Sequence, residues 1–385
     1  MSKLDFSLEE FTLRRHRVRQ AMGQAGHDWL VVFHPVSIHW LTGSDAKSYQ
    51  GFQCILLAAR DEGVTVITRE GERNEFTDDA LVDEVQTWGG GEPQDPLDVF
   101  KHVADGKGLR RARVAMEVPA YYLHPHHYVQ LKEWFGDALV SEATNLINDL
   151  KLVKSPAELA YIRHAGRLAD QAMARFAGSL QEGQSELEAA AGIYHALLSA
   201  GSGFAASTLN MVAGERSAFS HGAPTGRRFR RGDFGNVEYG AAFKRYTVTI
   251  GRQFCFGEPT ARMRELYQVV RAAADACIRE IRAGVPSVVP HEAAKKVIAQ
   301  AGLDRYRVHT SGYGIAPGFP PSWGEPVNMF GGNPYTLQAG MVVSVEPPVF
   351  IGAEKLGARI IDNVLVTEKG AELISTHDRG LIVVV

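Results

Sequence analysis

Two glutamates of this chain, Glu238 and Glu346, combine a charged side chain with a position that should be buried. Each stands six residues after a glycine, Gly232 or Gly340, in or next to an apolar run that is typical of a strand. Burying an unpaired carboxylate is costly, so such a group normally meets a cation, a metal ion or a substrate. Glu238 and Glu346 are therefore the first candidates for chemistry.

The composition limits the partners that these carboxylates could serve. The chain has 385 residues, a formal net charge of -3 and a pI near 6.5, and its Lys and Arg residues are dispersed. Dispersed charge predicts neither a nucleic-acid nor a membrane partner. Because the N-terminus lacks an apolar signal core, we expect a cytoplasmic protein that acts on a small molecule. The three cysteines lack CxxC spacing, which argues against a thiolate zinc site.

The elements that must position the glutamates fall into two domains, as the length of the chain suggests. Short β-rich runs separated by helical stretches predict an α/β domain over residues 1–148. Ser155 and Glu158 then have the spacing of a capping box, with Pro156 at the first helical position. A long helix is expected to begin there, and the second domain is placed at residues 149–385.

The second domain contains an internal repeat. Residues 183–201 and 284–302 both read as a glycine, then a serine, then an alanine-rich helix that ends in Ala-Gly. Each copy is followed by one of the strands that carry Glu238 and Glu346. Duplication predicts a pseudo-symmetric domain in which the two glutamates approach each other, whereas chance likeness of alanine-rich helices is the alternative.

Four motifs stand around these positions: KSPAE at 154–158, SHGAPT at 220–225, GMVVSVEP at 340–347 and DNVLVT at 362–367. Together they resemble the pita-bread family of aminopeptidase P, prolidase and creatinase, and residues 27–43 resemble that family's N-terminal domain. The resemblance covers essentially the whole chain. It implies an α+β protein in which a creatinase-like α/β domain (1–148) is followed by a pseudo-symmetric pita-bread catalytic domain (149–385).

The resemblance also bears on metal ions. Metallopeptidases of this family hold two metal ions with five side chains, and the matching positions here are Glu238, Thr249, Tyr313, Glu346 and Ile361. Only the two glutamates can ligate a divalent ion as carboxylates, so we expect no metal and no other cofactor. A mononuclear site that uses Glu238, Glu346 and His221 is the rival interpretation.

Without a metal ion, a side chain must supply the base or the nucleophile. His221 matches the histidine that is proposed as the general base of creatinase, the metal-free hydrolase of the family. The alternative is a loop histidine that caps a turn at Gly222. Two carboxylates without a metal also suit a planar cation, because they can pair with the N–H groups of an amidinium or guanidinium.

A closer likeness is to the ectoine hydrolase group. Glu238 followed by residues 244–246, and Tyr313 leading to residues 319–325, resemble that group. The likeness implies hydrolysis of a C–N bond in a small cationic amidine, with opening of ectoine to N-acetyl-diaminobutyrate as the first expectation. Glu238 or a water activated by His221 would attack the cationic carbon, and Tyr313 would donate a hydrogen bond to the tetrahedral centre.

Further residues are expected to bind the substrate. Trp323 and Phe319 could cover the cation, unless Trp323 is only a loop anchor. Arg252 could bind a substrate carboxylate, or could instead pair with Asp233 or Asp362. Glu325 lies in the same resembling segment as Trp323 and is grouped with the substrate-binding residues. Tyr49 is expected to reach the site of a neighbouring subunit, because enzymes that this chain resembles commonly work as dimers.

Three other functions stay open at this point. The first is a creatinase-like amidinohydrolase that acts on a guanidino compound. The second is a metal-dependent Xaa-Pro aminopeptidase or prolidase. The third is a catalytically dead pita-bread protein that binds peptides.

Overall fold

The computed structural model describes residues 2–60 and 63–385, and the chain forms two compact units, Met1–Lys151 and Leu152–Val385. The boundary expected from the sequence, between residues 148 and 149, falls inside helix α6 (Leu146–Lys151). This helix belongs to the first unit, and the second unit begins directly after it.

The N-terminal unit is built on a mixed six-stranded sheet in the order β4-β3-β2-β1-β5-β6. Strand β2 is antiparallel to both neighbours, whereas β1, β5 and β6 run parallel to one another. The strands are β1 (Trp29–Val32), β2 (Cys54–Ala58), β3 (Val64–Arg69), β4 (Glu84–Trp88), β5 (Val114–Met116) and β6 (Leu139–Glu142). The helices are α1 (Leu8–Gln24), α2 (Pro35–Thr42), α3 (Arg73–Asp79), α4 (Pro96–Gly106), α5 (Pro125–Phe135) and α6.

Alternation along β1 explains why this sheet is covered on both faces. Val31 packs into one hydrophobic cluster with residues of α4 and α5, whereas Leu30 and Val32 pack into a second cluster with residues of α1 and α2. Successive side chains of a strand point to opposite faces, so a continuous apolar run requires cover on both sides.

The C-terminal unit contains a larger sheet whose main path is β16-β15-β12-β10-β9-β8-β7, with β11 paired to β10 and β17 paired to β9. Its strands are β7 (Asn210–Ala213), β8 (Phe234–Phe243), β9 (Tyr246–Phe256), β10 (Tyr313–Phe319), β11 (Ser322–Asn328), β12 (Val342–Val345), β15 (Asp362–Val366), β16 (Ala371–Leu373) and β17 (Ile382–Val384). Strands β13 (Val349–Ile351) and β14 (Leu356–Ala358) form a separate hairpin.

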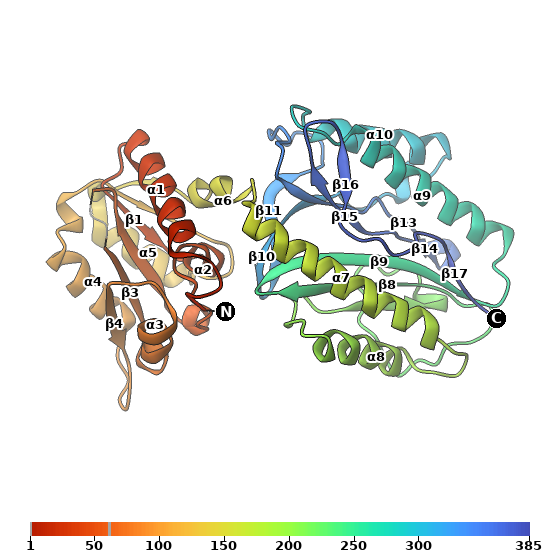
Figure 1. The fold of residues 1–385 in the computed structure, drawn as a ribbon, viewed down its shortest axis with the longest axis horizontal. Helices are drawn as coiled ribbons and strands as arrows, with labels where there is room; N and C mark the ends of the chain where they lie inside the picture. The colour runs from red at the N-terminus through yellow and green to blue at the C-terminus, as the bar shows by residue number, and fades with distance from the viewer. Residues whose placement is uncertain (1, 61–62) are drawn as a thin grey trace. The chain divides into compact units, whose positions relative to one another are not determined.

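Two pairs of helices pack on this sheet, one for each half of the repeat (Figure 1). The pairs are α7 (Pro156–Ser179) with α8 (Glu186–Ser199), and α9 (Ala261–Glu280) with α10 (Val288–Gln300). The Tyr239 hydroxyl of β8 donates to the Ala169 carbonyl of α7 at 2.8 Å. Val270 of α9 and Val364 of β15 share one hydrophobic core. The repeated segments of the sequence correspond to α8 and α10.

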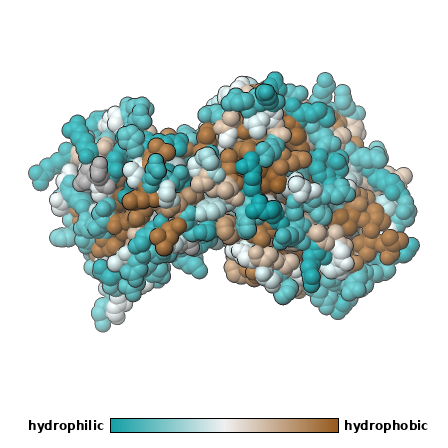
Figure 2. Space-filling view, in the orientation of Figure 1, coloured by the Kyte–Doolittle hydropathy of each residue, from teal (hydrophilic) through white to brown (hydrophobic). Residues whose placement is uncertain are grey.

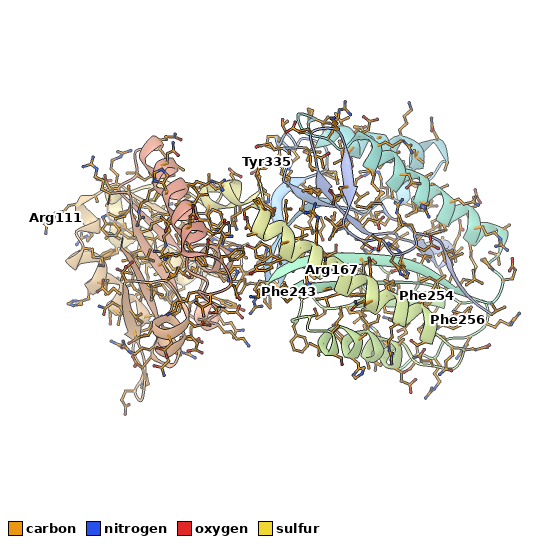
Figure 3. The ribbon with its side chains drawn as sticks, in the orientation of Figure 1. Arg111, Arg167, Phe243, Phe254, Phe256 and Tyr335 are labelled. Carbon is orange, nitrogen blue, oxygen red and sulfur yellow. The ribbon has the colours of Figure 1, made fainter. Side chains whose placement is uncertain are left out.

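The first helix of the unit begins where the sequence indicates. Ser155 and Glu158 form the reciprocal capping box at the start of α7, with Pro156 in its first turn. At the other end, Phe176 of α7 contacts Phe254 of β9, with ring centroids 5.7 Å apart. Phe254 and Phe256 lie near this end of α7 in Figure 3, and their rings are in edge contact with each other.

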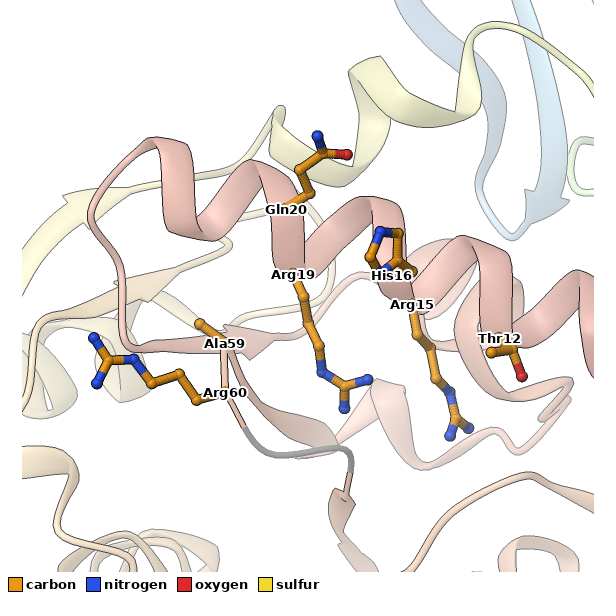
Figure 4. Close-up of a pocket in the computed structure, with 7 residues that line it drawn as sticks. All are labelled: Thr12, Arg15, His16, Arg19, Gln20, Ala59 and Arg60. Carbon is orange, nitrogen blue, oxygen red and sulfur yellow. The ribbon is translucent and has the colours of Figure 1, made fainter.

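The helices and the surface of the protein bear on contact with a membrane or a ligand. No helix among the described residues is both long and apolar enough to cross a membrane. Hydrophilic residues are spread over the visible face in Figure 2, with hydrophobic patches between them. The N-terminal unit has a basic hollow of about 600 Å³ lined by Arg15, His16 and Arg19 of α1 and by Arg60 (Figure 4). None of the predicted site residues lines this hollow.

A buried ion pair joins the start of the C-terminal unit to β11. Lys154 Nζ lies 2.7 and 2.6 Å from the two carboxylate oxygens of Glu325 and 3.2 Å from the Leu152 carbonyl oxygen. Both side chains are almost completely buried, at 0% and 2% exposed. Because neither charge can be solvated, each depends on the other.

Replacing Lys154 with Met should therefore destabilise the protein by about 3 to 5 kcal/mol, because Glu325 would stay buried without its cation. The double substitution Lys154→Met with Glu325→Leu should recover much of this loss. Lys295→Met, which removes a half-exposed pair with Glu292, is the control and should cost less than about 1 kcal/mol. Urea unfolding measures all three, and equal losses for Lys154→Met and Lys295→Met would contradict the assignment.

Candidate active site

Glu238 lies in the middle of β8 and is held by two donors. It is directly opposite Asn210 of β7 in the register, so the two side chains share one face of the sheet. Asn210 Nδ2 donates to Glu238 Oε2 at 3.0 Å. Arg359 Nη1 donates to the same oxygen and forms an ion pair with it. Glu238 is only 5% exposed, so water cannot solvate its charge. The two donors offset the free-energy cost of burying that charge.

Glu346 follows β12 and is the second buried carboxylate of the site. Ser344 Oγ donates to Glu346 Oε1 at 2.7 Å, and the Glu346 backbone N–H donates to the Ser311 carbonyl at 2.9 Å. Burial, and secondly the negative charge of Glu238, raises the pKa of Glu346 to about 8. The Arg359 charge and hydrogen bonds from Ser344 and Tyr313 oppose this rise. The negative charge of Glu238 acts on Glu346, so the two carboxylates lie close enough to interact.

Tyr313 stands between the carboxylates and Trp323. The Trp323 Nε1–H donates to the Tyr313 hydroxyl oxygen at 3.1 Å, so the tyrosine proton is left to point at another acceptor. Burial, and next the charge of Glu346, raises the pKa of Tyr313 above its usual range. Tyr313 is therefore a neutral hydrogen-bond donor beside Glu346.

The glycine before Tyr313 is required by the backbone. Gly312 has φ of +152°, and a Cβ at this position would lie 1.9 Å from the Ser344 carbonyl oxygen. Only glycine lets the two segments approach this closely. The approach places Tyr313 of β10 beside the end of β12 and thus beside Glu346.

His221 lies on the loop after β7 and is exposed. Its ring centroid is 5.9 Å from that of His309, which the sequence analysis did not consider. His309 Nδ1 lies 3.2 Å from the Thr310 carbonyl oxygen. Burial, with smaller contributions from the charges of Arg359 and His221, lowers the pKa of His309. Its position four residues before Tyr313 was the signal in the sequence that could have indicated it.

Three of the predicted substrate-binding residues contact partners inside the protein. Arg252 is completely buried, pairs with Asp362 at 3.0 Å and donates to four backbone carbonyls, so it has the structural role that was its alternative. Glu325 is paired with Lys154. The Phe319 ring is buried with the Arg245 guanidinium 4.4 Å from its centroid. Arg252, Glu325 and Phe319 thus have partners inside the protein, and a role for them in substrate binding stays a prediction.

Trp323 and Tyr49 differ from these three. Trp323 is buried and contacts the predicted site through its hydrogen bond to Tyr313, so its indole edge supports another site residue. Tyr49 lies in the N-terminal unit, where its ring is 5.5 Å from that of Tyr122. The homodimer that would carry Tyr49 to a neighbouring site stays a prediction.

The residues at the family's metal positions do not form a two-metal donor set. Thr249 is tied to Asn363, whose Nδ2 donates to Thr249 Oγ1 at 2.9 Å and whose Oδ1 accepts from the Thr249 N–H at 2.7 Å. Ile361 packs over Gly251, where a Cβ would meet Ile361 Cγ1 at 2.8 Å. Within residues 2–60 and 63–385, no three His, Cys, Asp or Glu side chains are grouped to hold a metal ion. The arginine on Glu238 adds a positive charge where such ions would bind.

Comparisons with known proteins agree with this architecture. Residues 14–153 match the creatinase/prolidase N-terminal domain, and residues 160–368 match metallopeptidase family M24. The probable dipeptidase PepE of Mycobacterium tuberculosis is 29% identical over 388 residues, covering 100% of this chain and 99% of the relative. The ectoine hydrolase of Halomonas elongata is 25% identical over 405 residues, covering 99% and 98%.

Solved structures have the same fold. Dipeptidase PepE from Mycobacterium ulcerans matches with a TM-score of 0.86 and 28% identity over 98% of this chain and 99% of its own. A prolidase from Thermococcus sibiricus matches with a TM-score of 0.87 over 99% and 100%, at 21% identity, which concerns the fold alone. The expected resemblance and the α+β, two-domain fold class are confirmed. The chain belongs to metallopeptidase family M24 and has a pita-bread domain that follows a creatinase/prolidase N-terminal domain.

Proposed function

We propose that this protein is a metal-independent hydrolase that cleaves a C–N bond of a small cationic amidine, with ectoine as the first candidate substrate. One observation carries the proposal: two buried carboxylates, Glu238 and Glu346, stand together while Thr249, Tyr313 and Ile361 occupy the other metal positions. A hydrolase family and a 25% identical ectoine hydrolase over nearly the full length support the class of reaction.

The electrostatics favour a cationic substrate. Glu346 holds a proton at neutral pH because burial and Glu238 disfavour a second negative charge. An amidinium that enters between the carboxylates would remove this penalty and allow Glu346 to ionise. Its planar N–H groups could then pair with both glutamates. A neutral ligand could accept hydrogen bonds from the site but would not compensate its negative charge.

The reaction can proceed with the residues of the chain. A Glu238 oxygen forms a bond to the amidinium carbon, and the electron pair of the C=N bond moves onto nitrogen. Protonated His221 gives its proton to one nitrogen, which leaves as the amine. Water then attacks the same carbon and the carboxylate departs. Of the two protons released in this step, His221 takes one and the leaving amine takes the other, so the products are an amide and an ammonium group. In the alternative, His221 activates a water that attacks directly.

A metal-dependent dipeptidase is the second candidate. It is favoured by the full-length similarity to PepE, whose identity to this chain is 29%. The donor set argues against it, because a threonine, a tyrosine and an isoleucine cannot replace the ligands of a dinuclear site. A creatinase-like amidinohydrolase would need the same two carboxylates and differs only in the substrate.

The activity is tested by offering ectoine, hydroxyectoine, creatine and Ala-Pro in parallel to protein that has been exhaustively chelated. We expect a product one water heavier than ectoine, with a rate that added Zn²⁺ or Mn²⁺ does not raise. Glu238→Gln should lower kcat by at least about 10³-fold and His221→Ala by about 10²-fold, whereas the exposed His195→Ala should have no effect. Metal-dependent cleavage of Ala-Pro with no amidine turnover would refute the proposal.

Binding of acetamidinium should be linked to proton release from Glu346. Since the pKa of Glu346 is about 8 in the free site, it is protonated at pH 7 and must ionise to pair with the cation. Affinity should therefore rise about tenfold per pH unit below pH 8 and level off above it. Calorimetry at pH 7 in buffers of different ionisation enthalpy should detect about one released proton. Glu346→Gln should abolish the release, and a wild-type affinity independent of pH would contradict the linkage.

A further inference from the structure

The two carboxylate oxygens of Glu238 have different surroundings. Oε2 accepts from both Asn210 Nδ2 and Arg359 Nη1. No described residue, within 2–60 and 63–385, makes a hydrogen bond to Oε1. A carboxylate that is fixed through one oxygen has its other oxygen fixed in direction as well. Glu238 is thus held with one oxygen occupied and one available.

Arg359 is itself fixed on several sides. Its backbone N–H donates to Gln253 Oε1 at 3.1 Å, and its Nη2 donates to Ser220 Oγ at 3.3 Å. Its guanidinium carbon lies 5.4 Å from the centroid of the Phe350 ring, and the side chain is 2% exposed. Arg359 therefore connects Glu238 to the residue that precedes His221. Arginine suits this place because its rigid fork bonds two acceptors at once.

Asn210 is fixed by the sheet. As the first residue of β7, it stands directly opposite Glu238, and the paired strands leave it little freedom to move along the ladder. A carboxylate can only accept hydrogen bonds, so the amide nitrogen of Asn210, and not its oxygen, must face Glu238. Asn210 is neutral and can orient the carboxylate without changing the charge of the site.

We propose that Asn210 and Arg359 are positioning residues that clamp Oε2 of Glu238 and present Oε1 to the substrate. The inference rests on the proposed function, because Glu238 must act on a bound cation. It goes further by assigning the two oxygens different tasks and by separating two contributions. Asn210 contributes direction alone. Arg359 contributes direction and a positive charge that a cationic substrate has to tolerate.

Because Arg359 contributes both orientation and charge, its removal should change substrate binding and turnover in opposite directions. Removing the Arg359 charge in Arg359→Met should strengthen acetamidinium binding, by about tenfold once the proton released by Glu346 is corrected for, because the cation no longer meets a neighbouring cation. The same change should lower kcat for the amidine by about 10²-fold or more, because Glu238 loses its orientation. A residue with only a structural role would weaken binding and turnover together. Arg359→Lys should restore the wild-type affinity and part of kcat.

Asn210→Leu removes a donor that orients the Glu238 carboxylate and leaves the charge of the site unchanged. We expect kcat to fall by about 10²-fold while the Kd of acetamidinium changes by less than about threefold. Asn236→Leu is the matched control, since Asn236 is a buried asparagine of β8 that bonds the Ser217 carbonyl and not Glu238. It should leave kcat within about threefold of wild type. Thermal unfolding of every variant checks that each is folded.

The outcomes separate the two proposals. If the wild type neither binds acetamidinium nor hydrolyses an amidine, the proposed function fails, and the clamp fails with it. If the wild type does both but Asn210→Leu keeps its kcat, the clamp alone is overturned. It is also overturned if folded Arg359→Met loses acetamidinium binding and turnover together. Tighter binding with slower turnover in Arg359→Met, and slower turnover alone in Asn210→Leu, would support it.

Discussion

The candidate site of the C-terminal unit depends on one electrostatic constraint: two carboxylates, Glu238 and Glu346, are buried near the guanidinium of Arg359. The positive charge of Arg359 compensates the negative charge of Glu238. Among the described residues, Glu346 has no such partner charge of its own and keeps a proton at neutral pH. Strand order serves this constraint, since β8 carries one glutamate, β12 ends at the other, and β10 lies between β9 and β12. A substrate cation would supply the second positive charge that Glu346 needs in order to ionise.

The sequence was sufficient to predict the fold class and the burial of two glutamates. Chain length, strand and helix patterns, the capping box at Ser155 and the repeat predicted two domains, and the family resemblance implied the α+β fold class. The apolar runs around Glu238 and Glu346 indicated that both are buried. These features are local or repeated, so they can be read without knowing which strands pair. The expected boundary between residues 148 and 149 falls inside α6, a helix that no pattern in the sequence had indicated.

The surroundings of the site could not be read in the same way. Asn210 reaches Glu238 only through the register of β7 on β8, which no local pattern specifies. Arg359 did leave a signal, because a lone arginine in the apolar run Leu356–Ile361 needs a carboxylate as much as the glutamates need a cation. Arg252, Glu325 and Phe319 were assigned by residue type and segment. Their partners within the protein, Asp362, Lys154 and Arg245, appear only in three dimensions.

The contact between Ile361 and Gly251 has a consequence for how this chain relates to the metal enzymes of its family. A branched apolar side chain fills the space that the missing Cβ of Gly251 leaves beside Glu238. A glutamate placed there alone would add a third carboxylate to a site with one compensating cation, while Thr249 stayed bound to Asn363. Such a substitution would therefore bury a further negative charge and lower stability. The hydrophobic contact between Ile361 and Gly251 thus acts as a barrier to acidic substitutions at position 361.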